Sequence, residues 1–336
     1  RRAVPVLPDY LGLSVGGTLS VGGYGVDSIV RGAVVDQVER LRLILPDGTP
    51  VWCSREEHPE LFCFSLAGLG QLGVVERVVL ETRSYQPTAV MYTYAYRDLG
   101  ELVASFAWMS AAEPERPFFF KAVRSRGRHV ATYGVYPESL RAVFSAPPPQ
   151  GLGDVPWRRR WVCPRYRSVR SLAVTFWVGR FPRRRRLWGD FLLDHPGLVR
   201  FADLLTALER RDAFAGTLEA IYFLAVRRPR GALELPFEAA GAGSGVKYLV
   251  GLYLMIPAGD ARALERAEQS LRFCLEQAVE LGGRPYLYGW HRFDGEIRDR
   301  LYGAHAERLH ALRQQLDPDA IFQPDKLLAA DGETSE

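Results

Sequence analysis

Glycines gather near the start of the sequence, and this segment holds the residue types best suited to holding a ligand. Six of them fall within residues 10–26, namely Gly12, Gly16, Gly17, Gly22, Gly23 and Gly25. Small residues let a chain turn tightly or let a ligand approach the backbone closely. Exposed N–H groups in such a run bind anions, including the pyrophosphate of a nucleotide cofactor. Because the spacing is neither G-x-G-x-x-G nor a Walker loop, a purely structural turn fits the run as well.

Several isolated side chains are capable of acid–base chemistry, and each also fits a plain structural role. Asp194 and His195 could relay a proton, although an aspartate ahead of Pro196 is more typical of a helix N-cap. His291 could line a cleft or lie at the surface. The conceivable second carboxylates are Glu219 and Glu238.

Arginine runs at residues 158–160 and 183–186 lie near tryptophans, a combination that can bind nucleic acid by charge and stacking. The 43 basic and 39 acidic residues leave a net charge of only +4, which favours a solvated face or a contact with a partner subunit. No run of 18 apolar residues occurs, which disfavours a spanning helix. We therefore expect neither nucleic acid nor a membrane as a partner.

Length and composition predict an ordinary globular protein. The 336 residues suit two domains or one large one, and 47% hydrophobic with 24% charged residues excludes global disorder. The four cysteines form no C-x-x-C pair. This spacing predicts no metal site and no disulfide framework, and it suits a reducing, cytoplasmic location.

The elements that must position these residues are predicted as a mixture of strands and helices. A hairpin is expected over residues 40–53, with Pro46-Asp47-Gly48 as its turn. A capping-box pattern over 54–57 places a helix start there, and the helix itself is expected over 59–67. Later segments with clear periodicity are strands over 74–81 and 247–256 and helices over 98–109, 195–210, 261–281 and 297–316.

The amino-acid sequence of the glycine-rich segment resembles that of flavoproteins of the vanillyl-alcohol-oxidase (PCMH) type, and among them the cytokinin dehydrogenases. The similarity is nearly continuous over residues 4–85 and patchy over 284–326. The matching pieces are Asp9-Tyr10-Leu11, Val15-Gly16-Gly17-Thr18-Leu19-Ser20, Arg31-Gly32, Asp36-Gln37-Val38, Val51-Trp52-Cys53-Ser54, Glu60-Leu61-Phe62, the stretch from Gly68 to Val75, Pro285-Tyr286-Leu287, Leu316-Asp317-Pro318 and Ile321-Phe322.

This resemblance implies an α+β fold and FAD as the cofactor. Residues 1–87 would form the second lobe of a discontinuous FAD-binding domain, to which residues 286–336 return. Residues 88–285 would be a substrate (cap) domain with an antiparallel sheet flanked by helices. The positions that match cofactor contacts of the family are Ser14, Gly16, Gly17, Thr18, Ser20, Tyr24, Val74, Val75 and Tyr286.

Asp9 matches the family's catalytic aspartate, so the resemblance implies oxidation of a C–N bond in a small-molecule substrate. A carboxylate that holds the N–H frees the nitrogen lone pair, which makes the neighbouring C–H a hydride donor. Oxygen or a quinone would then accept the electrons. Asp9 could instead cap a turn after Pro8. Oxidation of an alcohol or sugar C–OH, or a non-catalytic remnant of the fold, are the alternatives.

The sequence departs from the family at both ends. The family's first FAD lobe precedes the Asp-Tyr-Leu motif and has no counterpart in these residues, so we expect apolar surface to be uncovered on strands near residues 38–45 and 74–80. The family's C-terminal Ser-Pro-Gly-Gln is replaced by Gln323-Pro324-Asp325-Lys326.

Overall fold

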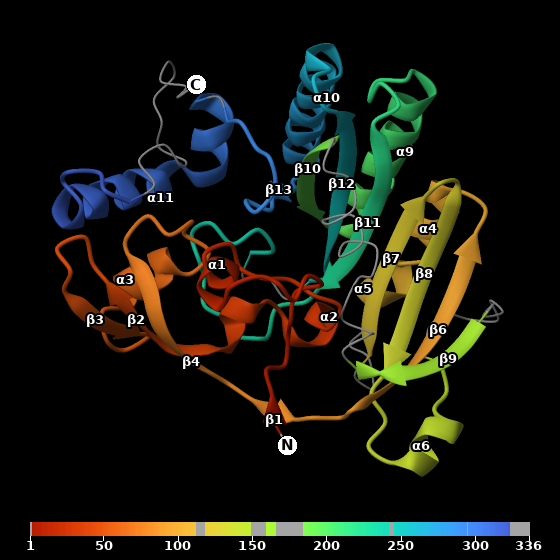
Figure 1. Ribbon diagram of the computed structural model, residues 1–336, viewed down its shortest axis with the longest axis horizontal. Coiled ribbons are helices and arrows are strands. Elements are labelled where there is room, and N and C mark those ends of the chain that lie inside the picture. Colours follow the sequence, from red (N-terminus) through yellow and green to blue (C-terminus); the bar gives the residue numbers. More distant parts are fainter. Residues whose placement is uncertain are drawn as a thin grey trace.

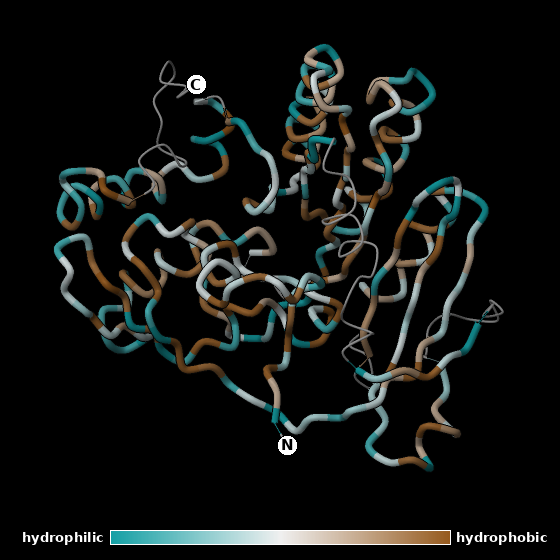
Figure 2. Tube along the Cα trace, in the orientation of Figure 1, coloured by the Kyte–Doolittle hydropathy of each residue, from teal (hydrophilic) through white to brown (hydrophobic). Residues whose placement is uncertain are grey.

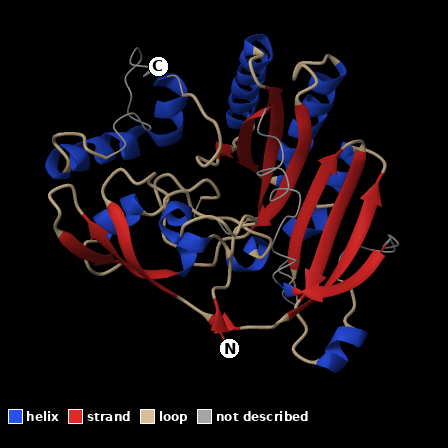
Figure 3. Cartoon of the chain, viewed as in Figure 1, coloured by secondary structure: helices blue, strands red, loops and turns tan. Residues whose placement is uncertain are grey.

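The computed structural model covers residues 1–336 and is described here for residues 2–111, 118–148, 159–165, 184–241, 245–293 and 295–322. Two sheets organise it, one of three strands and one of eight, and helices cover one side of the larger sheet (Figures 1 and 3). Every strand pair is antiparallel. The predicted α+β class, with a large antiparallel sheet flanked by helices, is confirmed.

The small sheet contains the expected hairpin. Strands β2 (Val38–Ile44) and β3 (Pro50–Ser54) pair across a turn in which Asp47 accepts a hydrogen bond from the Thr49 N–H at 2.8 Å. Gly48 has φ +84°, a left-handed geometry that favours glycine. Strand β4 (Val74–Leu80) completes the sheet in the order β3-β2-β4, close to its predicted bounds.

Helix α3 (Pro59–Ser65) follows the hairpin, but the predicted capping box does not start it. The Ser54 hydroxyl accepts hydrogen bonds from the N–H groups of Glu56 and Glu57, at 3.1 and 3.0 Å. It therefore closes a local turn, a use for which serine is equally suited. The helix begins five residues after Ser54, at Pro59.

The glycine-rich segment folds into short helical pieces against the small sheet. These are α1 (Val15–Leu19), α2 (Ser28–Arg31) and a 3₁₀ turn over Val34–Gln37. A two-residue pair, β1 (Arg2–Ala3) with β5 (Arg83–Ser84), fastens the chain's start to the exit of β4. The apolar side chains of this region form one of the two hydrophobic clusters in the described structure.

The large sheet has the strand order β13-β10-β12-β11-β7-β8-β6-β9. Its strands are β6 (Thr88–Tyr96), β7 (Phe119–Ser125), β8 (Arg128–Val135), β9 (Arg159–Pro164), β10 (Arg184–Leu193), β11 (Leu218–Val226), β12 (Lys247–Pro257) and β13 (Arg284–Pro285). Because successive side chains in a strand point to opposite faces, this sheet presents two chemically different surfaces.

One surface of the large sheet is apolar and packs against helices. Phe120, Tyr133, Phe223 and Tyr248 are all at most 1% exposed and belong to the other hydrophobic cluster. Helices α9 (His195–Arg210) and α10 (Ala261–Glu280) stand beside strands β10 and β12, and Figure 2 shows brown, hydrophobic stretches along these elements. Asp194 and Asp260 cap the two helices.

The helix predicted over residues 98–109 is broken into α4 (Leu99–Ala104) and α5 (Ala107–Ala111). The Ser105 hydroxyl donates to the Leu102 carbonyl at 2.6 Å, a local bond that competes with the helical ladder. The four apolar residues that define the predicted face remain buried, so the change is local: Leu99, Leu102, Phe106 and Met109.

Two further helices complete the fold. Helix α6 (Leu140–Ser145) lies near the N-terminal end, and α11 (Gly295–Leu316) is kinked at Gly303 (Figure 1). Helix α11 returns to the first part of the chain, where Arg313 donates to Gln71 at 3.1 Å. Among the helices that the structure describes, none is long and apolar enough to cross a membrane.

The prediction of exposed apolar surface is wrong for the first of the two strands, near residues 38–45. Val38, Leu41 and Leu43 are at most 6% exposed, because β2 is the central strand of the small sheet. Among the apolar side chains of the second strand, only Val74 is strongly exposed, at 53%. The other exposed apolar side chains of this region are Leu7, Leu11, Leu13 and Val15.

Candidate active site

The second surface of the large sheet carries polar and aromatic side chains and faces the first part of the chain. Strand register places Trp188 opposite Tyr253, Asp190 opposite Gly251, Gly251 opposite Tyr222, and Tyr222 opposite Val123, two residues from Lys121 on the same face. We call this set the polar strip: Trp188, Asp190, Tyr253, Tyr222 and Lys121. It crosses four neighbouring strands.

Asp9 lies against the polar strip. The Tyr222 hydroxyl donates to Asp9 Oδ2, and Asp9 Oδ1 is buried with no hydrogen-bond partner among the described residues. A Cβ on Gly25 would lie 1.9 Å from the Leu7 carbonyl oxygen, so the chain ahead of Asp9 can approach only because residue 25 is glycine. A glycine of the predicted segment thus positions the predicted base.

Burial and the neighbouring polar groups have opposite effects on the pKa of Asp9. Burial raises the pKa of the Asp9 carboxyl, while Lys121 and the hydrogen bond from Tyr222 each counteract part of that rise. Burial lowers the pKa of the Lys121 ammonium, and Asp9 counteracts part of that fall. Asp9 is thus a carboxyl whose ionisation depends on its two polar neighbours.

Asp190 is a second buried carboxyl in the polar strip, and the sequence analysis missed it. It is 2% exposed, its Oδ2 has no hydrogen-bond partner in the described part of the chain, and burial raises its pKa to about 8. A Cβ on Gly251 would lie 2.3 Å from Asp190 Oδ1, so glycine at 251 makes room for the carboxyl. Burial therefore favours the protonated form of Asp190, which can donate a hydrogen bond.

Tyrosines surround this second carboxyl. Burial and the neighbouring Asp190 raise the pKa of Tyr253 and of Tyr288, which follows β13. The Tyr288 ring lies 5.6 Å from that of Trp188 and 5.3 Å from that of Tyr286. A sequence signal for Asp190 existed, since it is the one charged residue in the otherwise apolar run 187–193.

The structure brings together predicted cofactor residues from distant parts of the chain. The Gly23 N–H donates to the Tyr286 hydroxyl at 3.2 Å, and the rings of Tyr24 and Tyr286 lie 4.7 Å apart. A Cβ on Gly16 would lie 3.6 Å from Val75 Cβ, which puts α1 against β4. Tyr286 thus links the glycine-rich segment to the polar strip through Tyr288.

The backbone around α1 is less open than a free loop. Ser14 caps the helix by accepting from the Gly17 N–H at 3.1 Å, and the Thr18 and Ser20 hydroxyls donate to the carbonyls of Ser14 and Gly16. The N–H groups of Thr18 and Ser20 are also bonded within the segment. The expected row of exposed N–H groups is therefore reduced to the start of α1.

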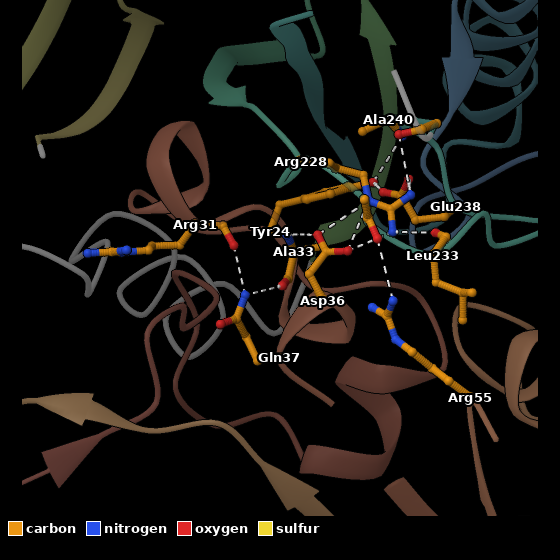
Figure 4. A network of polar contacts seen from close by, with 12 residues as sticks. Tyr24, Arg31, Ala33, Asp36, Gln37, Arg55, Arg228, Leu233, Glu238 and Ala240 are labelled. Atoms are coloured by element: carbon orange, nitrogen blue, oxygen red, sulfur yellow. Dashed lines mark hydrogen bonds and ion pairs between the residues drawn. The ribbon is translucent and has the colours of Figure 1, made fainter. Parts of the chain in front are cut away.

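A buried ionic network binds the Tyr24 hydroxyl (Figure 4). The Tyr24 hydroxyl donates to Glu238, and Arg228 lies between Asp36 and Glu238, at 2.6 and 3.2 Å from their carboxylate oxygens. The side chains of all three charged residues are at most 2% exposed. Glu238, a conceivable second carboxylate from the sequence, is thus engaged in this network.

The remaining sequence candidates lie outside the polar strip. Asp194 accepts from the Gly197 N–H at 2.8 Å as an N-cap, and His195 Nε2 contacts the Val103 carbonyl oxygen at 3.1 Å, so the two do not form a relay. His291 Nδ1 contacts the Gly289 carbonyl, and Glu219 pairs with Arg184 at 3.7 Å. Arg158, Arg183 and Gln323-Pro324-Asp325-Lys326 lie outside the described residues.

Comparison with known proteins first defines a class of fold. The solved structure of xylooligosaccharide oxidase from Myceliophthora thermophila C1 in complex with xylobiose matches with a TM-score of 0.67, over 98% of this chain and 72% of that one, at 17% identity. The fold is thus that of a vanillyl-alcohol-oxidase (PCMH) type oxidase. No protein-family model matches the chain.

Sequence comparison then gives the particular relatives. Cytokinin dehydrogenase 7 of Oryza sativa subsp. japonica is 26% identical over 366 residues, covering 95% of this chain and 68% of that protein. An uncharacterized oxidoreductase, ORF5 in the fasciation locus of Rhodococcoides fascians, is 40% identical over 100 residues, which span 30% of this chain and only 23% of that protein. The homologues of this chain are thus cytokinin dehydrogenases and a further oxidoreductase, as the sequence motifs predicted.

Proposed function

We propose that this protein is an FAD-dependent oxidoreductase of the cytokinin-dehydrogenase-like kind, which removes hydride from a carbon next to nitrogen in a small molecule. The observation that carries the proposal is Asp9, held by Tyr222 against the polar strip at the start of the glycine-rich segment. The name of one homologue, cytokinin dehydrogenase 7, supports a cytokinin-dehydrogenase-like activity, and the name of the other supports an oxidoreductase.

The residues around α1 suit a flavin ring. Leu11, Leu13, Val15 and Val74 are 43–53% exposed, and such apolar side chains gain by being covered by a flat, largely apolar ring. In the proposal Ser14, Gly16, Gly17 and Val75 hold the cofactor on this side, and Tyr286 contacts its ring from the strip side. Bound FAD supplies the hydride acceptor, and oxygen or a quinone reoxidises it.

The chain's own contribution to this chemistry is position and charge. Asp9 accepts the N–H hydrogen bond of the substrate, which leaves the nitrogen lone pair free to assist loss of hydride from the neighbouring carbon. The hydrogen bond from Tyr222 fixes the direction of the carboxylate. Burial of the Asp9 oxygens keeps water from competing for that contact.

A second candidate is oxidation of a C–OH group, and Asp190 favours it. In this candidate Asp9, which lies against the polar strip, accepts a hydrogen bond, and Asp190 within the strip donates one, because burial raises the pKa of Asp190 to about 8. Such a set, with the Tyr253 and Tyr288 hydroxyls, can bind a molecule that carries several hydroxyl groups. Asp9 would then take the proton of the reacting hydroxyl.

Anaerobic reduction of the flavin-loaded protein separates these proposals. A cytokinin that bleaches the flavin band would support C–N oxidation, and an oligosaccharide that does so would support C–OH oxidation. If neither reduces the flavin while dithionite does, oxidation of these two kinds of donor is excluded. In each positive case Asp9→Asn must slow the reduction, with the surface variant Asp203→Asn as the matched control.

A further inference from the structure

Lysine is scarce in this protein, and one lysine lies in the polar strip. Of 43 basic residues, only Lys121, Lys247 and Lys326 are lysines. Elsewhere the chain uses arginine for its ion pairs, from the buried Arg228 to the exposed Arg308. The one cation that the described part of the strip contains is thus a compact, strongly hydrated ammonium, which adjusts to its surroundings more readily than a planar guanidinium.

Strand register brings Lys121 to Asp9. Tyr222 of β11 lies opposite Val123 of β7, so Lys121, two residues earlier on the same face, is the diagonal neighbour of Tyr222. Long side chains reach across such diagonals. Tyr222 donates to Asp9, and the charge of the Lys121 ammonium acts on the same carboxyl from the adjacent strand.

Other titratable groups face this pair from the neighbouring elements. Cys163 of β9 lies on the Lys121 side, while Tyr253 of β12 and Tyr288 lie on the Asp9 side. Burial raises the pKa of both tyrosines, which keeps them uncharged at neutral pH. Among the described residues, the Lys121 ammonium is the positive charge that lowers the pKa of Asp9.

A base must be ionised to accept a proton or an N–H bond, yet burial favours the protonated carboxyl. We propose that Lys121 is a positioning residue that keeps Asp9 in its carboxylate form, so that the site holds a ready base at neutral pH. Asp190 is the internal comparison: it is buried in the same strip, no cation contributes to its pKa, and that pKa rises to about 8.

The pairing itself is tested without any enzyme activity, although its role in catalysis rests on the proposed function. Lysine labelled with ¹³C at Cε gives at most three signals to follow through a pH titration. Lys121→Arg removes and thereby assigns one of them. We expect the midpoint of the Lys121 signal to fall in Asp9→Asn, because the ammonium loses its anion, and to stay in place in Asp203→Asn. An unchanged midpoint in Asp9→Asn overturns the inference.

The proposed role of Lys121 in catalysis is tested by the pH profile of flavin reduction. Lys121→Met should move the acid limb of the profile to higher pH, because Asp9 then stays protonated over a wider range. Lys121→Arg should restore the limb, and Lys247→Met, a lysine at the end of β12, should leave it unchanged. A limb that Lys121→Met does not move excludes the role in catalysis. A protein that no substrate reduces contradicts the proposed function alone, and the lysine titration still decides the pairing.

Discussion

At the scale of single residues, two carboxyls at the polar strip, Asp9 and Asp190, differ in the groups beside them. Asp9 has a hydroxyl and an ammonium beside it, whereas Asp190 has only tyrosines and space left by Gly251. Burial raises the pKa of both carboxyls, and only at Asp9 do a hydrogen bond and a neighbouring charge counteract part of that rise. Two predictions follow from this contrast.

The first concerns the base. Asp9→Asn should lower the rate of flavin reduction by about 10²–10⁴-fold, the usual contribution of a general base. The flavin should remain bound, because the amide oxygen can still accept from Tyr222. Stopped-flow reduction of the flavin-loaded variant measures the rate. An unchanged rate would remove Asp9 from the mechanism.

The second concerns pH and stability. The Asp190 pKa is about 8 in the folded protein and 3.8 is its ordinary value, so the folded state binds this proton more tightly than the unfolded state. Its contribution to stability is complete below about pH 4 and is lost as the pH rises toward 8. Burial also raises the pKa of Asp27, but only to about 6, so its contribution to stability is lost at a lower pH than that of Asp190.

Asp190→Asn should therefore flatten the stability profile between pH 6 and 8 in particular. Urea unfolding at fixed pH values measures the effect. Asp203→Asn, on the exposed side of α9, should leave the profile as in the parent protein. A variant profile that still falls between pH 6 and 8 would contradict the assignment.

Sequence motifs predicted Asp9 but not its partners, and the reason is physical. Asp9 lies within a local pattern of consecutive residues, which can be recognised in one dimension. Asp190, Tyr222 and Lys121 come from three strands that are joined only by sheet register, which a single sequence does not specify. The chain's periodicity could show alternating faces, but not which face meets Asp9.

At the scale of elements, buried polar contacts decide how the segments are held. The hairpin, α9 and α10 follow their predicted bounds because turn residues, caps and apolar periodicity agree there. The predicted helix over 98–109 fails at Ser105, and the predicted cap at Ser54 forms a turn instead. Both errors involve serines, whose hydroxyls bond to nearby backbone in several ways.

A buried ion pair of Arg228 with Asp36 joins the segment after β11 to the 3₁₀ turn. Arg228→Met should destabilise the protein by about 3–5 kcal/mol, because it leaves Asp36 and Glu238 buried without their cation. Chemical denaturation measures the loss. The exposed pair of Arg308 and Glu60 provides the control, and Arg308→Met should have little effect. Equal effects of both variants would refute the special role of the network.

At the scale of the whole molecule, the face beside α1 has exposed apolar side chains where the proposed flavin would lie. Leu11, Leu13, Val15 and Val74 are each more than 40% exposed, and most N–H groups of α1 are already bonded. One side of a bound cofactor would therefore remain in water, and each lost 1.4 kcal/mol weakens binding about tenfold.

We accordingly expect this chain alone to bind FAD more weakly than about 1 µM and to self-associate through the exposed face. Titration of FAD by quenching of its fluorescence measures the affinity, and light scattering measures the association. Leu13→Ser with Val15→Ser should reduce association. Tight binding by a soluble monomer would show that the chain builds a complete cofactor site on its own.

The two-faced sheet has a consequence for how this protein can change over time. Within β10, Leu187, Phe191 and Leu193 serve the helix-packed core, while Trp188 and Asp190 face the other way. Within this strand, positions 187, 191 and 193 thus belong to the helix-packed core, while positions 188 and 190 line the proposed site. Substitutions at the positions that line the proposed site can change the bound ligand, while the positions of the helix-packed core keep the fold. A library restricted to residues 188, 190, 222 and 253 would sample new specificities and spare the helix-packed core.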